Sequence, residues 1–147
     1  MSEHFRKLEH LYLAAPINAI YDPAIEIGDG RAAIEIEVDT RFWHAASAVH
    51  GSVYFKMLDD AAFFAANSLV EDHFVLTASF NTYFTRPVAE GRIRSVGAVV
   101  SRSRRVVLAE AQVFDQDGRE IGRGSGSFMP SHIRLTEEMG YRLPETG

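Results

Sequence analysis

Two neighbouring aspartates interrupt an otherwise apolar stretch of the chain, and they are the first residues that could do chemistry. Between Val53 and Val70 the charged residues are Lys56, Asp59 and Asp60, and apolar side chains fill nearly the whole circumference of the helix that this stretch predicts. Such a helix is typically buried at the centre of a domain. Because an unpaired carboxylate taken out of water is costly or becomes neutral, at least one aspartate should face a partner group, a cavity or a subunit boundary.

A histidine and a glycine stand at the expected start of the same helix. His50 and Asp59 are nine residues apart, which an α-helix converts into about 13 Å and opposite faces. The two side chains cannot meet within one helix, so a reaction centre that uses both must be assembled from two chains related by a two-fold axis. Gly51 allows close backbone approach, and the free N–H groups at a helix start suit a developing oxyanion. An oxyanion site opposite a carboxylate nucleophile or base fits acyl transfer.

The elements that must position these residues follow from hydrophobic periodicity. Residues 5–12 repeat at helical spacing, so a short amphipathic helix should end before Pro16. Alternation predicts a hairpin of residues 25–27 and 32–38, followed after the central helix by strands at 75–84, 93–101, 106–114 and 120–129. Their short connections imply antiparallel pairing. The fold class is therefore α+β, with a long central helix wrapped by an antiparallel sheet of five or six strands.

The length of the chain sets the domain organisation. At 147 residues we expect a single domain over 1–147, with an N-terminal helical extension at 1–20 and a polar C-terminal tail at 131–147. A single sheet around one helix leaves an edge strand that needs cover, and a dimer is the simplest way to provide it.

The composition removes several classes of function. The net charge of -5 comes from interleaved acidic and basic residues, so no broad basic face predicts nucleic-acid binding. The chain has no cysteine, and its scattered histidines lack ligand spacing, so we expect no metal site. No stretch approaches the ~20 apolar residues of a membrane span, and the start of the chain lacks a secretion signal. These features predict a soluble, cytoplasmic protein with no membrane partner.

Several short motifs share the order and spacing found in one known family. They are the HG pair at 50–51 with an aspartate at 59, TASFNTYFTRPVAEG at 77–91, SRSRR at 101–105 and DGR at 117–119. Over roughly residues 25–130 the chain thereby resembles the hotdog-fold acyl-CoA thioesterases, of the phenylacetyl-CoA thioesterase type. The resemblance implies a hotdog fold, a homodimer that often pairs again into a tetramer, and hydrolysis of an acyl-CoA thioester without metal or organic cofactor.

The resemblance also implies roles for individual residues. Asp59 matches the catalytic aspartate, which acts as nucleophile or as base for water. Gly51 matches the glycine whose N–H polarises the thioester carbonyl, and His50 matches the histidine that shapes that loop. Thr77 matches a hydroxyl residue that orients water or the carboxylate.

This sequence departs from the family pattern near the helix start. His44 stands where the type usually has asparagine, Ser47 where it often has glycine, and Ser52 replaces a second glycine. His44 is a candidate substrate contact, although a surface histidine is the alternative. Arg102 and Arg104 are candidate contacts for CoA phosphates, because guanidinium groups bind phosphate bidentately, although arginines in turns are often simply solvated.

Simpler interpretations of the same residues stay open. Asp59 could be satisfied by backbone or by Lys56, and Asp60 is expected to be structural. His50 could serve as a helix cap, and Thr77 as an ordinary strand residue. At the level of function, the alternatives are a non-catalytic acyl-CoA binding or sensor protein and a hotdog-fold dehydratase or hydratase. The sequence does not specify the acyl chain, the carrier, the pathway or the choice between dimer and tetramer.

Overall fold

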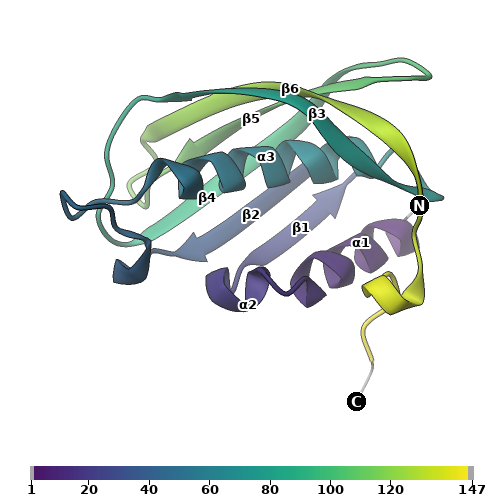
Figure 1. The fold of residues 1–147 in the computed structure, drawn as a ribbon, viewed down its shortest axis with the longest axis horizontal. Helices are drawn as coiled ribbons and strands as arrows, with labels where there is room; N and C mark the ends of the chain where they lie inside the picture. Colours follow the sequence, from purple (N-terminus) through teal and green to yellow (C-terminus); the bar gives the residue numbers. More distant parts are fainter. Residues whose placement is uncertain (1, 146–147) are drawn as a thin grey trace.

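The computed structural model describes residues 2–145, in which one long helix lies across the concave face of a six-stranded sheet (Figure 1). The strand order is β1-β2-β4-β5-β6-β3, and every neighbouring pair is antiparallel. The expected α+β hotdog arrangement is confirmed, with six strands. The elements are α1 (Ser2–Ala14), α2 (Asn18–Tyr21), β1 (Ala24–Gly28), β2 (Arg31–Glu37), η1 (Thr40–Phe42), α3 (Gly51–Asn67), β3 (His73–Phe84), β4 (Arg92–Arg102), β5 (Val107–Phe114), β6 (Glu120–Arg134) and η2 (Glu137–Met139).

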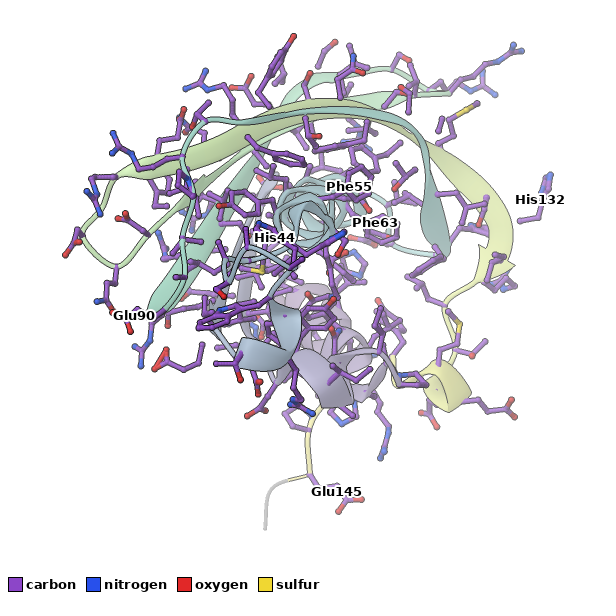
Figure 2. All side chains as sticks on the ribbon, turned by 60° about the vertical axis from the view of Figure 1, so that its left-hand side comes forward. His44, Phe55, Phe63, Glu90, His132 and Glu145 are labelled. Carbon is purple, nitrogen blue, oxygen red and sulfur yellow. The ribbon has the colours of Figure 1, made fainter. Side chains whose placement is uncertain are left out.

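The central burial of α3 follows from its apolar circumference. Every residue from Ala61 to Ser68 is buried, and Figure 2, which looks nearly along the helix, shows the sheet curving around it. Gly97 on β4 sets how closely helix and sheet approach, because a Cβ added there would lie 2.4 Å from the backbone of Ala61. The sheet therefore holds α3 at a fixed distance, and with it the residues that α3 carries.

The two edges of the sheet differ in how they are covered. At β1, the Glu9 carboxylate accepts a hydrogen bond from the Ile27 N–H at 2.8 Å, and Arg6 donates to the Ile27 carbonyl at 2.6 Å. Helix α1 thus satisfies backbone groups that an edge strand would otherwise leave unpaired. At the other edge, no described strand pairs with the outer side of β3, where Leu76 and Tyr83 are 47% and 67% exposed.

The C-terminal segment differs most from the expectation. Strand β6 runs to Arg134 rather than ending at 129, and the residues after it pack on α1. The Tyr141 hydroxyl bonds His4 Nδ1 at 2.6 Å, and His10 Nδ1 donates to the Gly140 carbonyl at 2.7 Å. These single contacts between distant positions hold the segment, which explains why it shows no periodicity. No helix within residues 2–145 has the length and apolar character needed to cross a bilayer.

Candidate active site

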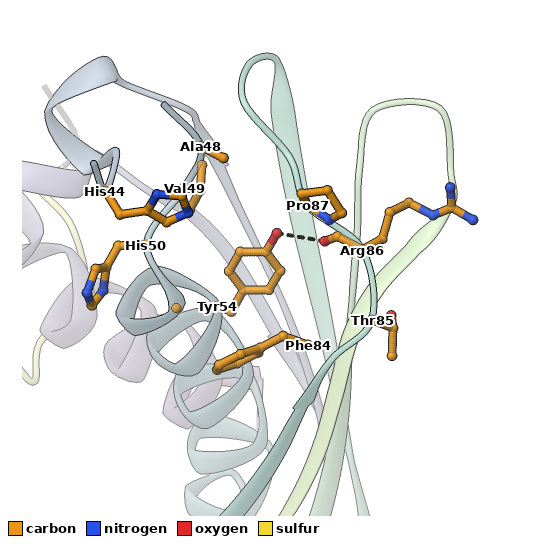
Figure 3. Close-up of a pocket in the computed structure, with 10 residues that line it drawn as sticks. His44, Ala48, Val49, His50, Tyr54, Phe84, Thr85, Arg86 and Pro87 are labelled. Carbon is orange, nitrogen blue, oxygen red and sulfur yellow. Dashed lines mark hydrogen bonds between the residues drawn. The ribbon is translucent and has the colours of Figure 1, made fainter. Parts of the chain in front are cut away.

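The start of α3 borders an open cleft of about 590 Å³ (Figure 3). One wall is the segment that leads into the helix, with the side chains of His44, Val49 and His50. The opposite wall is the end of β3 and the turn after it, from Phe84 to Pro87. Tyr54, on the first turn of α3, joins the two walls, because its hydroxyl donates to the Arg86 carbonyl at 2.7 Å.

Both histidines of the cleft use Nδ1 as an acceptor. His50 is the N-cap of α3, and its Nδ1 accepts from the Ser52 N–H at 3.0 Å, as capping residues do with the free donors of a first turn. His44 Nδ1 accepts from the Ala46 N–H, also at 3.0 Å. In a neutral imidazole whose Nδ1 is an acceptor, Nε2 carries the hydrogen. Each ring therefore keeps a donor, Nε2–H, for a ligand.

The loop between these histidines has an unusual backbone. Ser47 has a φ of 63°, in the left-handed region that favours glycine. The strain fits the glycine that the resemblance places there, and it amounts to about 1 kcal/mol for a residue with a Cβ. Hydrogen bonds from the Ser47 N–H to the His44 carbonyl and from the His44 N–H to the Ala48 carbonyl hold the turn.

Gly51 supplies the backbone donor of the cleft. As the first residue of α3 it has no acceptor for its N–H among the described residues. A Cβ at this position would lie 2.9 Å from Cε2 of Phe84, so the glycine also permits the ring to pack against the helix start. The free N–H, together with the positive end of the helix dipole, suits a carbonyl oxygen that gains negative charge.

Asp59 and Thr77 meet on a different side of α3. The Thr77 hydroxyl donates to Asp59 Oδ1 at 3.0 Å. Thr77 pairs with Phe128, a buried residue on the helix side of the sheet, and a bulge follows between Thr77 and Ser79. Bulges commonly redirect a side chain near a functional site, and this one begins directly after the residue that bonds the carboxylate.

Burial changes the acidity of Asp59. Loss of hydration is the largest effect and raises the pKa of this carboxyl from the ordinary 3.8 to about 6. The hydrogen bond from Thr77 lowers the pKa, Asp60 raises it, and Lys56 lowers it. A carboxylate of this kind is a candidate functional group. Its surroundings do not fully replace the hydration that its ionised form has lost, yet that form exists near neutral pH.

The neighbouring aspartate has a different set of partners. Lys56 Nζ donates to Asp60 Oδ2 at 2.5 Å, and the Tyr12 hydroxyl donates to the same oxygen at 2.7 Å. Asp60 is therefore structural, as predicted. The alternative in which Lys56 satisfies Asp59 is not what the structure shows.

The predicted site residues fall into three groups. His44, His50 and Gly51 share the cleft, whereas Asp59 and Thr77 lie apart from it. Arg102 and Arg104 lie at the hairpin between β4 and β5, where the Arg102 guanidinium donates to the Leu69 carbonyl at 3.0 Å and Arg104 is exposed. The wall from Phe84 to Pro87 lies within the motif at 77–91, but sequence reasoning assigned these residues no role at the site. The pairing of Tyr54 with a carbonyl 32 positions away leaves no local signal.

No group of three or more histidine, aspartate or glutamate side chains in residues 2–145 is arranged to hold a metal ion. The site consists of a carboxylate, a hydroxyl, imidazole donors and a backbone N–H. A long helix wrapped by an antiparallel sheet, with this set of groups around the helix, defines a hotdog-fold protein of the thioesterase kind.

Comparisons with known proteins agree with that class. The family model for the thioesterase superfamily matches residues 46–121, about half of the chain, and the protein belongs to that superfamily. A protein of Mycobacterium tuberculosis, provisionally named an esterase, is 29% identical over 103 residues, covering 67% of this chain and 74% of its own length.

Solved structures extend the similarity over most of the chain. A thioesterase family protein from Silicibacter pomeroyi superposes with a TM-score of 0.81 at 26% identity, over 90% of this chain and 99% of its own. The PaaI protein from the phenylacetic acid degradation operon of E. coli gives a TM-score of 0.83 over 92% of this chain and 98% of its own, at 15% identity. The second similarity concerns the fold alone.

Proposed function

We propose that this protein is an acyl-CoA thioesterase whose active site is shared between two subunits. The observation that carries the proposal is the partly buried Asp59 carboxylate, which accepts a hydrogen bond from Thr77 and has no ion-pair partner within residues 2–145. The same helix offers the free Gly51 N–H at its start, about 12 Å away along the axis. Two copies of the chain can bring these groups together, whereas one copy cannot.

The reaction needs few groups because a thioester carbonyl is already activated. The Gly51 N–H donates to the carbonyl oxygen and stabilises the negative charge that develops on it. Asp59 either attacks the carbonyl carbon, so that CoA leaves as a thiolate and water then hydrolyses the acyl anhydride on Asp59, or accepts a proton from a water that attacks the carbonyl and expels the CoA thiolate. In both routes the net reaction consumes one water and gives the acid and CoA. Thr77 orients the carboxylate. His50 fixes the helix start, and His44 contributes its Nε2–H to the substrate in the cleft.

The uncovered β3 edge supports the homodimer. This strand carries Thr77 in its first half and Phe84, which packs on Gly51, at its last position. A partner that pairs along β3 would bury the exposed apolar side chains and cover the unpaired backbone.

The arginine hairpin supports CoA as the carrier. Thr77, Phe128, Val107 and Arg102 form one row across four neighbouring strands, which puts Thr77 and Arg102 about 14 Å apart. The pantetheine arm of CoA, about 13 bonds from sulfur to the first phosphorus, extends to roughly 15 Å. The length of the arm therefore matches the distance from Thr77 to the arginine hairpin. No cofactor beyond the CoA of the substrate is required.

Heterodimers test the shared site. Asp59→Asn removes the carboxylate, and Gly51→Pro removes the N–H at a first helical position that accepts proline, after a His50 that already has an extended ψ of 144°. Each variant alone should be inactive towards acyl-CoA. An equal mixture after subunit exchange should regain about a quarter of wild-type activity, because half of the dimers then hold one intact site of two.

Two controls define the outcomes of this test. A mixture of Asp59→Asn with Thr77→Ala, two changes on the same side of the site, should regain far less, because both damage the same half. No recovery in the first mixture, despite confirmed exchange, would contradict the shared site. Binding of CoA without turnover of short, long or aromatic acyl-CoAs by the wild type would contradict catalysis and favour a non-catalytic binder.

A further inference from the structure

A largely buried lysine lies between the N-terminal helices and α3. Lys56 Nζ donates to Asp60 at 2.5 Å, to Asn18 Oδ1 at 2.8 Å and to the Tyr12 hydroxyl at 3.1 Å. It also lies 5.0 Å and 4.9 Å from the ring centres of Tyr12 and Tyr21. Its side chain is only 12% exposed. All the donors of this ammonium are therefore engaged on the side of α3 that faces α1 and α2.

The sequence of α3 offers this lysine two carboxylates. Asp59 follows Lys56 by three residues and Asp60 follows it by four, and both spacings bring side chains together on a helix surface. Helical geometry alone therefore does not decide which aspartate receives the charge.

Residues from the N-terminal helices make that decision. The Tyr12 hydroxyl donates to Asp60 at 2.7 Å while it accepts from Lys56, so it joins the two ions. Asn18 adds a further acceptor for Lys56, and its own amide is fixed by a 2.7 Å bond to the Tyr12 carbonyl. Burial and the adjacent Asp60 raise the pKa of the Tyr12 phenol, so it remains a donor.

We propose that Tyr12 and Asn18 are positioning residues for the reaction, because they hold Lys56 on Asp60 and keep its charge away from the carboxylate of Asp59. The inference rests on the proposed role of Asp59. An ammonium within contact distance would pair with that carboxylate, reduce its basicity and occupy the oxygen that must reach the thioester or water. The N-terminal helices thus act on the reacting group from a distance, through the lysine.

The surroundings of Asp59 make it responsive to such a change. Its charged neighbours in the described structure are Lys56 and Asp60 on its own helix, and β3 faces it with the uncharged Thr77 hydroxyl. The pKa of Asp59 is already raised to about 6 by burial. Movement of Lys56 from Asp60 to Asp59 would remove much of that rise.

The test distinguishes an effect of the Lys56 charge on Asp59 from general damage to the fold. In the double variant Tyr12→Phe/Asn18→Leu, the side-chain carboxyl ¹³C shift of Asp59, identified by its loss in Asp59→Asn, should titrate about one pH unit lower than in the wild type. Tyr12→Phe alone keeps the ring that packs on Phe64 and should give part of the shift. This single variant decides the test if the double variant folds poorly.

The matched control repeats both variants in a Lys56→Met background. There the N-terminal changes should leave the Asp59 titration unmoved, because no ammonium can relocate. The proposal is overturned if the double variant titrates like the wild type, or if the lower titration persists without Lys56. In the pH profile of kcat/KM for acyl-CoA hydrolysis, the fall on the acid side should shift by the same amount as the NMR titration of Asp59. An absence of hydrolysis in every variant would refute the proposed function, while the NMR titration would still decide the inference.

Discussion

Replacing the two adjacent aspartates by asparagine should change stability in opposite directions. The pKa of Asp59 is raised on folding from 3.8 to about 6, so the ionised carboxylate opposes the folded state. The full rise corresponds to about 3 kcal/mol, and the partial exposure of the group reduces our expectation to about 1–2 kcal/mol. Asp59→Asn should therefore be more stable than the wild type by about 1–2 kcal/mol at pH 8, with hydrolysis abolished. The asparagine can still accept the hydrogen bond from Thr77.

The pH dependence gives this prediction its sign. A carboxyl with a raised pKa in the folded state contributes its full stability below 3.8 and loses it as the pH rises through about 6. The advantage of Asp59→Asn should therefore be near zero at pH 4 and grow across this window. Urea unfolding at fixed protomer concentration, monitored by circular dichroism, measures it at each pH.

Asp60→Asn is the matched control. Asp60 is ion-paired with Lys56, and their side chains are 20% and 12% exposed. Removal of one partner of such a pair costs about 3 kcal/mol, because the other charge stays buried without compensation. The control should therefore be destabilised at pH 8. Equal destabilisation by both substitutions, or an Asp59→Asn difference that does not vary with pH, would refute the assignment of the two carboxylates.

Three further outcomes follow from the geometry. Gly97→Ala should lower the free energy of unfolding by about 2–3 kcal/mol in urea titrations, because the new methyl meets the backbone of Ala61 at 2.4 Å. His44→Leu should cost about 1 kcal/mol by thermal denaturation, since the Ala46 N–H loses its acceptor, while His44→Asn, which can form the same turn, should cost less. The kcat/KM of acyl-CoA hydrolysis should fall tenfold per unit as the pH drops well below 6, because Asp59 must be ionised to react.

The sequence predicted the elements that local patterns encode. The apolar circumference of 53–70 predicted a buried central helix, and α3 spans Gly51–Asn67. Alternation in 25–38 predicted the hairpin of β1 and β2, including the turn at Gly28 to Gly30. These signals are strong because each residue is constrained by its immediate neighbours along the chain.

Features built from distant pairs were not predictable in this way. Whether Lys56 pairs with Asp59 or Asp60 is decided by α1 and α2, which lie 38 to 44 positions earlier in the chain. The bond between Thr77 and Asp59 came only from the family resemblance, and the bulge after Thr77 has no signature in TASF. The tail packs through Tyr141 on His4 across 137 positions.

The geometry of β3 fixes the register of the proposed dimer. Thr77, beside Asp59, and Phe84, beside Gly51, are seven residues apart in sequence. Because the bulge after Thr77 takes up one residue, they are six ladder positions apart, or about 20 Å. If β3 pairs antiparallel with the partner's β3, one register sets Thr77 opposite the partner's Phe84. The two-fold axis then passes through Asn81, which lies opposite Asn81 of the partner subunit.

Because the chain has no cysteine, single substitutions can read this register directly. Asn81→Cys would place two Cα atoms about 5 Å apart across the axis, within the range of a disulfide, and should give a covalent dimer on mild oxidation. Tyr83→Cys on the same strand face would place them about 14 Å apart and should stay unlinked. Non-reducing electrophoresis distinguishes the two. Linking at 83 rather than 81 would shift the axis by two residues and separate Asp59 from the partner's Gly51, so the shared site could not form.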